Sequence, residues 1–129
     1  MKLLYAALFA LLSINLAGTD PIMQFAELIG KGNIHELAKS FAPTIDITLA
    51  DATNTYSKAQ AELVLTQFFT QNKPLSSKML HKVNSGNNFE FGVVIINTDK
   101  GIYRASFTLK NTNGSMQLIE LRVETEKVK

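Results

Sequence analysis

The sequence predicts an α+β domain in which two or three helices come first and pack on a strongly curved antiparallel sheet. Before Pro74, apolar residues mostly recur every three or four positions, as they do along one face of a helix. After Pro74 they recur at every second position, as in half-buried strands. The gaps between these later stretches are short and rich in Asn, Gly and Ser, which favours hairpins. Helices followed by hairpin-connected strands indicate the α+β class.

Three helices are predicted in the first half of the chain. Asp20 caps the first helix ahead of a proline, and one apolar stripe runs through to Ile29. Asn33 begins the second helix, which Pro43 ends. Ser57 caps the third, whose stripe again has helical spacing.

Five strands are predicted. Residues 44–49 alternate apolar with polar side chains, whereas residues 51–56 have the composition of a polar loop. The remaining strands follow the period-two pattern and cover about 77–84, 89–98, 102–110 and 116–125.

The apolar rows of the last three strands are predicted to share the inner, helix-covered face. All of them are odd-numbered and include Phe91 and Phe107. The residue numbers of facing residues in an antiparallel pair add up to a constant sum. A two-residue Asn113-Gly114 turn makes this sum odd and would set polar residues opposite the apolar row. We therefore expect a three-residue loop, Thr112-Asn113-Gly114, with Gly114 left-handed.

The even-numbered residues then form the outer face of the sheet. Aliphatic side chains on that face exceed what a solvated surface needs, which indicates an interaction site. The predicted interaction face consists of Val94, Ile96, Ile102, Leu118, Arg104 and Arg122. We expect a homodimer or another protein partner there. The two arginines either receive a carboxylate or phosphate or form a cross-strand charge ladder with neighbouring glutamates.

A signal peptide is predicted over residues 1–18, with a single mature domain over 19–129. Lys2 provides the positive n-region, and the unbroken apolar run Leu3–Leu12 is too short to span a bilayer, which takes about 20 helical residues. Small residues ending at Gly18 form a cleavage zone. We expect a periplasmic or secreted protein with no stable membrane span after cleavage. A buried N-terminal helix or an uncleaved anchor is the alternative.

Composition and charge restrict the function further. The 129 residues include 13 Lys and Arg against 11 Asp and Glu, a net charge of +2. This balance is too even for a protein that depends on neutralising phosphates, so no nucleic-acid partner is expected. The chain has no cysteine, which excludes disulfides and thiolate catalysis, and its only histidines are His35 and His81. We therefore expect no metal and no cofactor.

Several segments resemble a family of small exported bacterial proteins of unknown function. These are Tyr56-Ser57-Lys58-Ala59-Gln60-Ala61, Phe89-Glu90-Phe91-Gly92, Gly101-Ile102-Tyr103-Arg104 and Glu120-Leu121-Arg122-Val123-Glu124. That family is assigned to the superfamily of nuclear transport factor two, ketosteroid isomerase and scytalone dehydratase, which has a cystatin-like cone. The resemblance covers about residues 20–125. It implies a bent sheet wrapped on helices with a pocket between them, and no particular activity, because this fold hosts enzymes and binding proteins.

A pocket inside such a cone is the second candidate site. His81 is odd-numbered, like Met79 and Val83 on the same predicted strand, so its side chain should point to the same face as theirs. This predicts that His81 faces the cone. The predicted lining residues are His81, Tyr103, Tyr56, Phe91 and Phe107. A few polar groups on apolar walls suit a small hydrophobic ligand. The simpler interpretation makes His81 a hydrogen-bonded core or rim residue and Tyr103 a core aromatic.

Two functions follow from these sites. The first is an exported, non-enzymatic binding or interaction domain of unknown ligand. The alternative is an isomerase-like or dehydratase-like enzyme that uses His81 as acid/base, with the tyrosines as donors. The enzyme needs an open cone. The binding domain allows a cone filled by phenylalanines, namely Phe25, Phe68, Phe91 and Phe107.

The leader makes a prediction of its own. Protein exported by the native host should begin between about Gly18 and Asp20 when its intact mass is measured, because the apolar run and the small residues form a cleavable signal. An exported pool that mostly retains Met1 would contradict the prediction.

Overall fold

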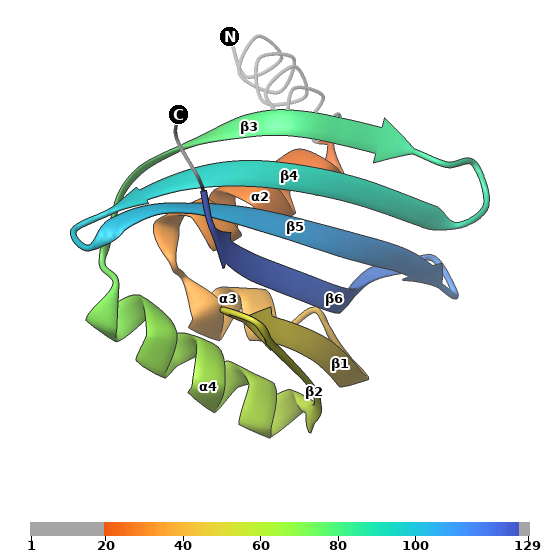
Figure 1. Cartoon of the computed structure of the whole chain (residues 1–129). Coiled ribbons are helices and arrows are strands. Elements are labelled where there is room, and N and C mark those ends of the chain that lie inside the picture. Colours follow the sequence, from red (N-terminus) through yellow and green to blue (C-terminus); the bar gives the residue numbers. More distant parts are fainter. Residues whose placement is uncertain (1–19, 127–129) are drawn as a thin grey trace, which may run out of the picture.

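A computed structural model describes residues 20–126, and the predicted signal peptide lies outside this range. The helices are α2 (Pro21–Lys31), α3 (Ile34–Ala38) and α4 (Lys58–Gln71). The strands are β1 (Phe41–Leu49), β2 (Ala52–Ser57), β3 (Pro74–Asn84), β4 (Phe89–Thr98), β5 (Gly101–Thr112) and β6 (Ser115–Thr125). Figure 1 shows one curved sheet with the helices on its inner side, which confirms the predicted α+β class. Across 20–126, no helix has the length and apolar character needed to cross a membrane.

The helices begin where their capping residues predict. The side chain of Asp20 accepts a hydrogen bond from the Ile22 amide at 3.1 Å, and Ser57 accepts one from the Gln60 amide at 3.3 Å. Gly32 ends α2 with a φ of 66°, a left-handed conformation that glycine adopts without steric cost. Local sequence therefore determines the ends of α2 and the start of α4.

The six strands lie in the order β2-β1-β6-β5-β4-β3. Only β1 and β6 pair in parallel, and every other neighbouring pair is antiparallel. Strand β2 occupies the segment predicted as a polar loop, and that prediction is wrong. All its side chains except Tyr56 are exposed, so an apolar alternation could not reveal it.

The predicted face of β4 is also wrong. A two-residue turn, Asp99-Lys100, joins β4 to β5, so Thr98 pairs with Gly101 and Val94 pairs with Ala105. Even-numbered residues of β4 therefore share the inner face with odd-numbered residues of β5. Val94 and Ile96 are only 1% and 0% exposed, whereas Phe91 lies on the outer face.

A bulge in β6 replaces the predicted three-residue loop. Thr112 pairs with Ser115 across a two-residue turn in which Asn113 and Gly114 both have positive φ, as a type I′ hairpin requires. The register then shifts at Ile119, an extra residue between Leu118 and Glu120. The bulge lets both Leu118 and the odd-numbered residues that follow it face the core.

A bulge also moves His81 to the outer face. Met79 pairs with Val94 on the inner side, Leu80 is the extra residue, and His81 pairs with the outward-facing Val93. Odd-numbered residues of β3 therefore face inward before Leu80 and outward after it. The predicted position of His81 in the cone is wrong.

Phe107 and Gly92 form the cross-strand pair that aligns β4 with β5. Phe107 is buried, and a Cβ atom placed on Gly92 would overlap its ring. We expect Phe107→Ala to cost about 3–5 kcal/mol of unfolding free energy, as for other emptied aromatic sites. Gly92→Ala should cost about 1–3 kcal/mol, because the ring must move. Urea denaturation measures both.

The double variant Gly92→Ala/Phe107→Ala is the control for this pair. Once the ring is gone the added methyl group has room, so the second substitution should cost clearly less than it does alone. Strictly additive costs would contradict the contact.

Asp20 predicts a pH dependence of stability. A hydrogen bond from Lys82, whose Nζ lies 3.0 Å from Oδ2, is the main cause that lowers the pKa of Asp20 below 3.8. Desolvation opposes this shift, and the Ile22 amide adds to it. Because the folded-state pKa is the lower one, the stabilisation is complete above the unfolded-state pKa. It is lost as the pH falls through the folded-state pKa.

The variant Asp20→Asn removes the charge of the side chain but keeps a helix cap, because asparagine also caps helices. It therefore separates the contribution of the charge to stability from that of the cap. Its urea midpoint should lie below that of the wild type near neutral pH, and the difference should vanish in acid. Asp20→Ala should remain less stable than Asp20→Asn throughout. A difference between wild type and Asp20→Asn that does not change with pH would contradict the role of the charge.

Candidate functional site

The residues predicted to line a pocket are divided between the two faces of the sheet. Phe107 is buried on the inner face, where the Tyr103 hydroxyl donates to Asn72 Oδ1 at 3.0 Å. Tyr56 is half-buried on β2, at the far edge of the sheet. His81 and Phe91 are exposed on the outer face. The structure therefore does not bring these five side chains together.

Aromatic and aliphatic side chains occupy the space between the helices and the sheet. Phe25 and Phe107 are buried there, and Phe68 packs against the same core, with its ring centroid 5.2 Å from that of Tyr103. Phe91, the fourth phenylalanine predicted to fill the cone, lies outside it. Two phenylalanines that were not predicted to fill the cone, Phe41 and Phe69, are buried in the core.

The predicted interaction face is only partly at the surface. Val94, Ile96 and Leu118 belong to the core, for the reasons of register given above. Ile102, Arg104 and Arg122 remain accessible on the outer face. An apolar outer surface exists, but Ile102 is the only aliphatic residue of the predicted face that contributes to it, and other residues form the rest.

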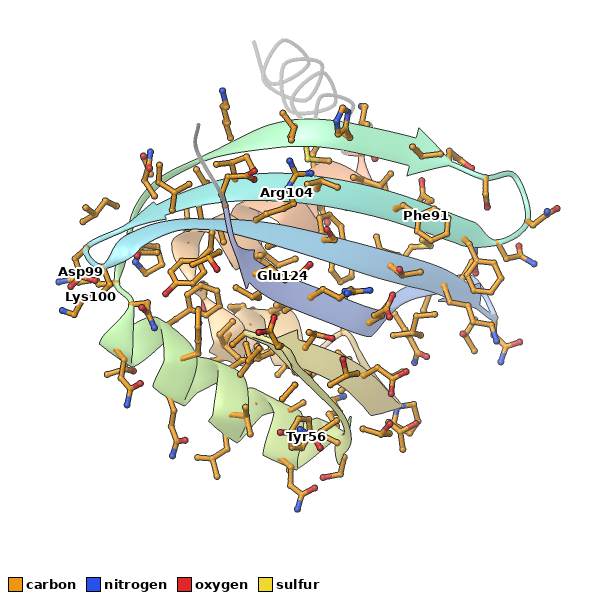
Figure 2. The ribbon with its side chains drawn as sticks, in the orientation of Figure 1. Tyr56, Phe91, Asp99, Lys100, Arg104 and Glu124 are labelled. Carbon is orange, nitrogen blue, oxygen red and sulfur yellow. The ribbon has the colours of Figure 1, made fainter. Side chains whose placement is uncertain are left out.

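These residues form what we call the outer strip, a row of accessible apolar side chains along β4 and its neighbours. They are Phe89, Phe91, Val93 and Ile95 of β4, Val83 of β3 and Ile102 of β5. Phe91 is 42% exposed and lies opposite Val83, which is 54% exposed. Figure 2 shows Phe91 toward one end of β4. Contiguous apolar surface of this kind commonly marks an interaction site.

Charged side chains lie on both sides of the outer strip. Lys78 and His81 on β3 pair with Ile95 and Val93, which gives that side a basic character. On the other side, Lys110 Nζ lies 5.9 Å from the Phe89 ring centroid, a cation–π contact. A polar rim around an apolar centre is the usual arrangement of a protein interface.

The contacts of Arg104 fit the cross-strand charge ladder among the predicted alternatives, whereas the contact of Arg122 is with a glutamate of its own strand. The Arg104 guanidinium donates to both carboxylate oxygens of Glu126, from Nε at 2.8 Å and from Nη2 at 3.3 Å. This hydrogen bonding is the main cause that raises the pKa of Arg104. Arg122 Nε lies 3.8 Å from Glu124. Arg104 and Glu124 are labelled on the outer side of the sheet in Figure 2.

A groove of about 550 Å³ continues the outer face beyond Phe89. It lies where β1 and β6 lose their common register between Phe41 and Asp46, next to the bulge at Ile119. Asp46 and Glu120 line it, and their carboxylates accept hydrogen bonds from Thr55 and Thr108 at 2.6 and 3.3 Å. Sequence patterns gave no signal for this groove, because it depends on a parallel pairing and a bulge.

His35 has a partner that sequence reasoning missed. Its Nδ1 atom lies 3.2 Å from Glu62 Oε2, which connects α3 to α4. Among residues 20–126 no group of three or more His, Cys, Asp or Glu side chains is placed to hold a metal ion. The His35 and Glu62 side chains are 79% and 37% exposed, so this pair is a surface contact between two helices.

Comparisons with known proteins identify the family. No curated protein matches the sequence. DUF4783 family proteins of known structure from Bacteroides uniformis and Bacteroides ovatus share 18% and 19% identity with this chain, with TM-scores of 0.78 and 0.75. The first alignment covers 84% of this chain and 100% of the other; the second covers 79% and 92%.

A more distant structure has the same fold. It is a candidate dehydratase of the NTF2-like family from Streptomyces avermitilis, with 9% identity, a TM-score of 0.57, and coverage of 81% of this chain and 89% of that one. The family model described as a domain of unknown function, DUF4783, matches residues 22–124. The chain therefore belongs to the DUF4783 family and has an NTF2-like fold.

Proposed function

We propose that this protein is an exported, non-enzymatic interaction domain whose outer strip binds the apolar surface of a protein partner. The observation that carries the proposal is the Phe91–Val83 pair, two large apolar side chains that remain about half exposed while the core is filled without them. Burying them against a partner removes apolar surface from water, which favours association. Export rests on the predicted leader.

The shape of the surface favours a protein over a small molecule. Small-molecule sites are concave and enclose most of the ligand, whereas the outer strip runs along an open sheet face. The charges around the strip describe the partner. It should carry acidic groups opposite Lys78 and His81 and basic groups toward Asp46 and Glu120, around an apolar centre. A second copy of the chain is one such partner.

The enzyme alternative has less support. An acid/base residue must lie within hydrogen-bond range of the substrate together with its donors. His81 lies on the outer face of β3, whereas Tyr103 faces the core and Tyr56 lies at the opposite edge of the sheet. The likeness to a candidate dehydratase extends to the fold alone.

A photo-reactive phenylalanine analogue at position 91 tests the proposal in the native host. We expect irradiation to give an adduct of defined mass, because position 91 contacts the partner. The same analogue at Leu63, an exposed residue of α4, serves as the control and should give no such adduct. The mass separates a second copy from another protein.

Val83→Lys should abolish the adduct, because it places a charge within the outer strip. Its stability should change by no more than about 0.5 kcal/mol, as is usual at exposed sites. Equal labelling from positions 91 and 63, or an adduct that survives Val83→Lys, would contradict the proposal.

A further inference from the structure

The two edges of the sheet differ in how they are protected from pairing with another strand. At the β3 edge, the register with β4 is interrupted twice, at Leu75 and at Leu80. Lys78 and Lys82 add charge to the same strand. Bulges and lysines are the devices that keep exposed edges from extending a sheet. Strand β3 is therefore a protected edge.

The β2 edge has none of these devices. Its six residues, Ala52–Ser57, include no charged residue, no proline and no glycine. Its register with β1 is unbroken from Ala52 to Ser57. Each of its side chains is exposed except the half-buried Tyr56, so β2 lies at the surface of the molecule. In that range its recorded backbone hydrogen bonds lie within its pairing with β1.

An edge strand carries backbone donors and acceptors that point away from the sheet. In an antiparallel pair, alternate residues direct their N–H and C=O groups to the outer side. Because β2 is an edge strand that pairs only with β1 in the six-stranded sheet, these groups match the pattern that an added antiparallel strand presents.

We propose that β2 pairs antiparallel with β2 of a second copy across a two-fold axis. Two six-stranded sheets then become one continuous sheet. The commitment to a second copy follows from charge, because self-pairing about a two-fold axis sets residues near the axis opposite their own copies. Like charges placed in this way are destabilising, and β2 carries none. Strand β3 could not pair with itself so easily, because of its two lysines.

Face matching restricts the register. Thr53 and Thr55 lie on the outer face opposite Thr48 and Asp46, whereas Asn54 and Tyr56 lie on the inner face opposite Ile47 and Ile45. A two-fold axis perpendicular to the sheet keeps each face on its own side, so a residue near the axis meets its own copy. Asn54 or Thr55 is then the residue at the axis. An axis at Thr55 also places Thr53 opposite Ser57 of the second copy, and hydroxyl pairs of this kind are favourable.

This association does not depend on the proposed function. Strand β2 lies at one edge of the sheet, and the strands β1 and β6 separate it from the outer strip. Six residues a side make a small interface, so the dimer should be weak and should depend on concentration.

Single cysteines test the pairing cleanly, because the chain has none of its own. Two variants are needed, Asn54→Cys and Thr55→Cys, because either residue could lie at the axis. The variant whose cysteine lies at the axis should form an intermolecular disulfide under mild oxidation at hundreds of micromolar protein. Leu63→Cys on α4 measures random collision, and Phe91→Cys reports contact through the outer strip. We expect the faster of the two β2 variants to cross-link at least tenfold faster than Leu63→Cys.

A lysine introduced beside the two-fold axis provides a second test of the pairing. Adding Asn54→Lys to the Thr55→Cys chain should reduce cross-linking to the rate of Leu63→Cys, because two positive charges would meet across the axis. Circular dichroism checks that each variant remains folded. Cross-linking at both β2 positions that is no faster than at Leu63 would overturn the proposal. Fast cross-linking at Phe91 alone would also overturn it, and would place the second copy on the outer strip.

Discussion

The contact between the Phe107 ring and Gly92 is the constraint on which the surface of this protein depends. Only a glycine leaves room for the ring on the neighbouring strand, so the pair sets the register of β4 against β5. Strand side chains alternate between faces, and a slip of one residue would exchange the two rows completely. The same contact therefore buries Val94 and Ile96 and leaves Phe91 outside.

Bulges adjust the other strands to this alignment. The extra residue at Ile119 allows Leu118 and Leu121 to share the core, although their numbers differ in parity. The extra residue at Leu80 sends Met79 inward and His81 outward. These two positions explain why the inner face is continuous and why the outer face carries both apolar and charged side chains. The resulting surface suits a partner protein, whereas the filled cone leaves the predicted catalytic side chains apart.

Features encoded by neighbouring residues could be predicted from the sequence. The caps at Asp20 and Ser57, and the change of period at Pro74, each depend on a few adjacent positions. Which row of β4 side chains faces the core could not be predicted in this way, because both rows are apolar and either could form the core. Strand β2 escaped prediction because an exposed edge strand needs no apolar residues. The parallel pairing of β1 with β6 joins segments about 75 residues apart, beyond the reach of any local pattern.

The same reasons explain what was predicted of the candidate site. The sequence predicted an apolar interaction face on the outer side of the sheet beside Arg104 and Arg122. Accessible apolar side chains do lie on that side, and their role in an interaction stays a prediction. The aliphatic residues assigned to it were mostly wrong, since Val94, Ile96 and Leu118 lie in the core. An apolar row on each face of β4 was the signal, and the rows are assigned by the two-residue turn at Asp99-Lys100 together with the fit of Phe107 against Gly92.

Thiol accessibility along β4 tests this assignment most directly. Single cysteines at positions 93, 94, 95 and 96 of the cysteine-free chain would each be reacted with a maleimide under native conditions, and the labelling rates compared. Fast labelling at 93 and 95 with slow labelling at 94 and 96 is the predicted result. The reverse alternation would place Val94 and Ile96 outside, and would contradict both the register and the outer strip.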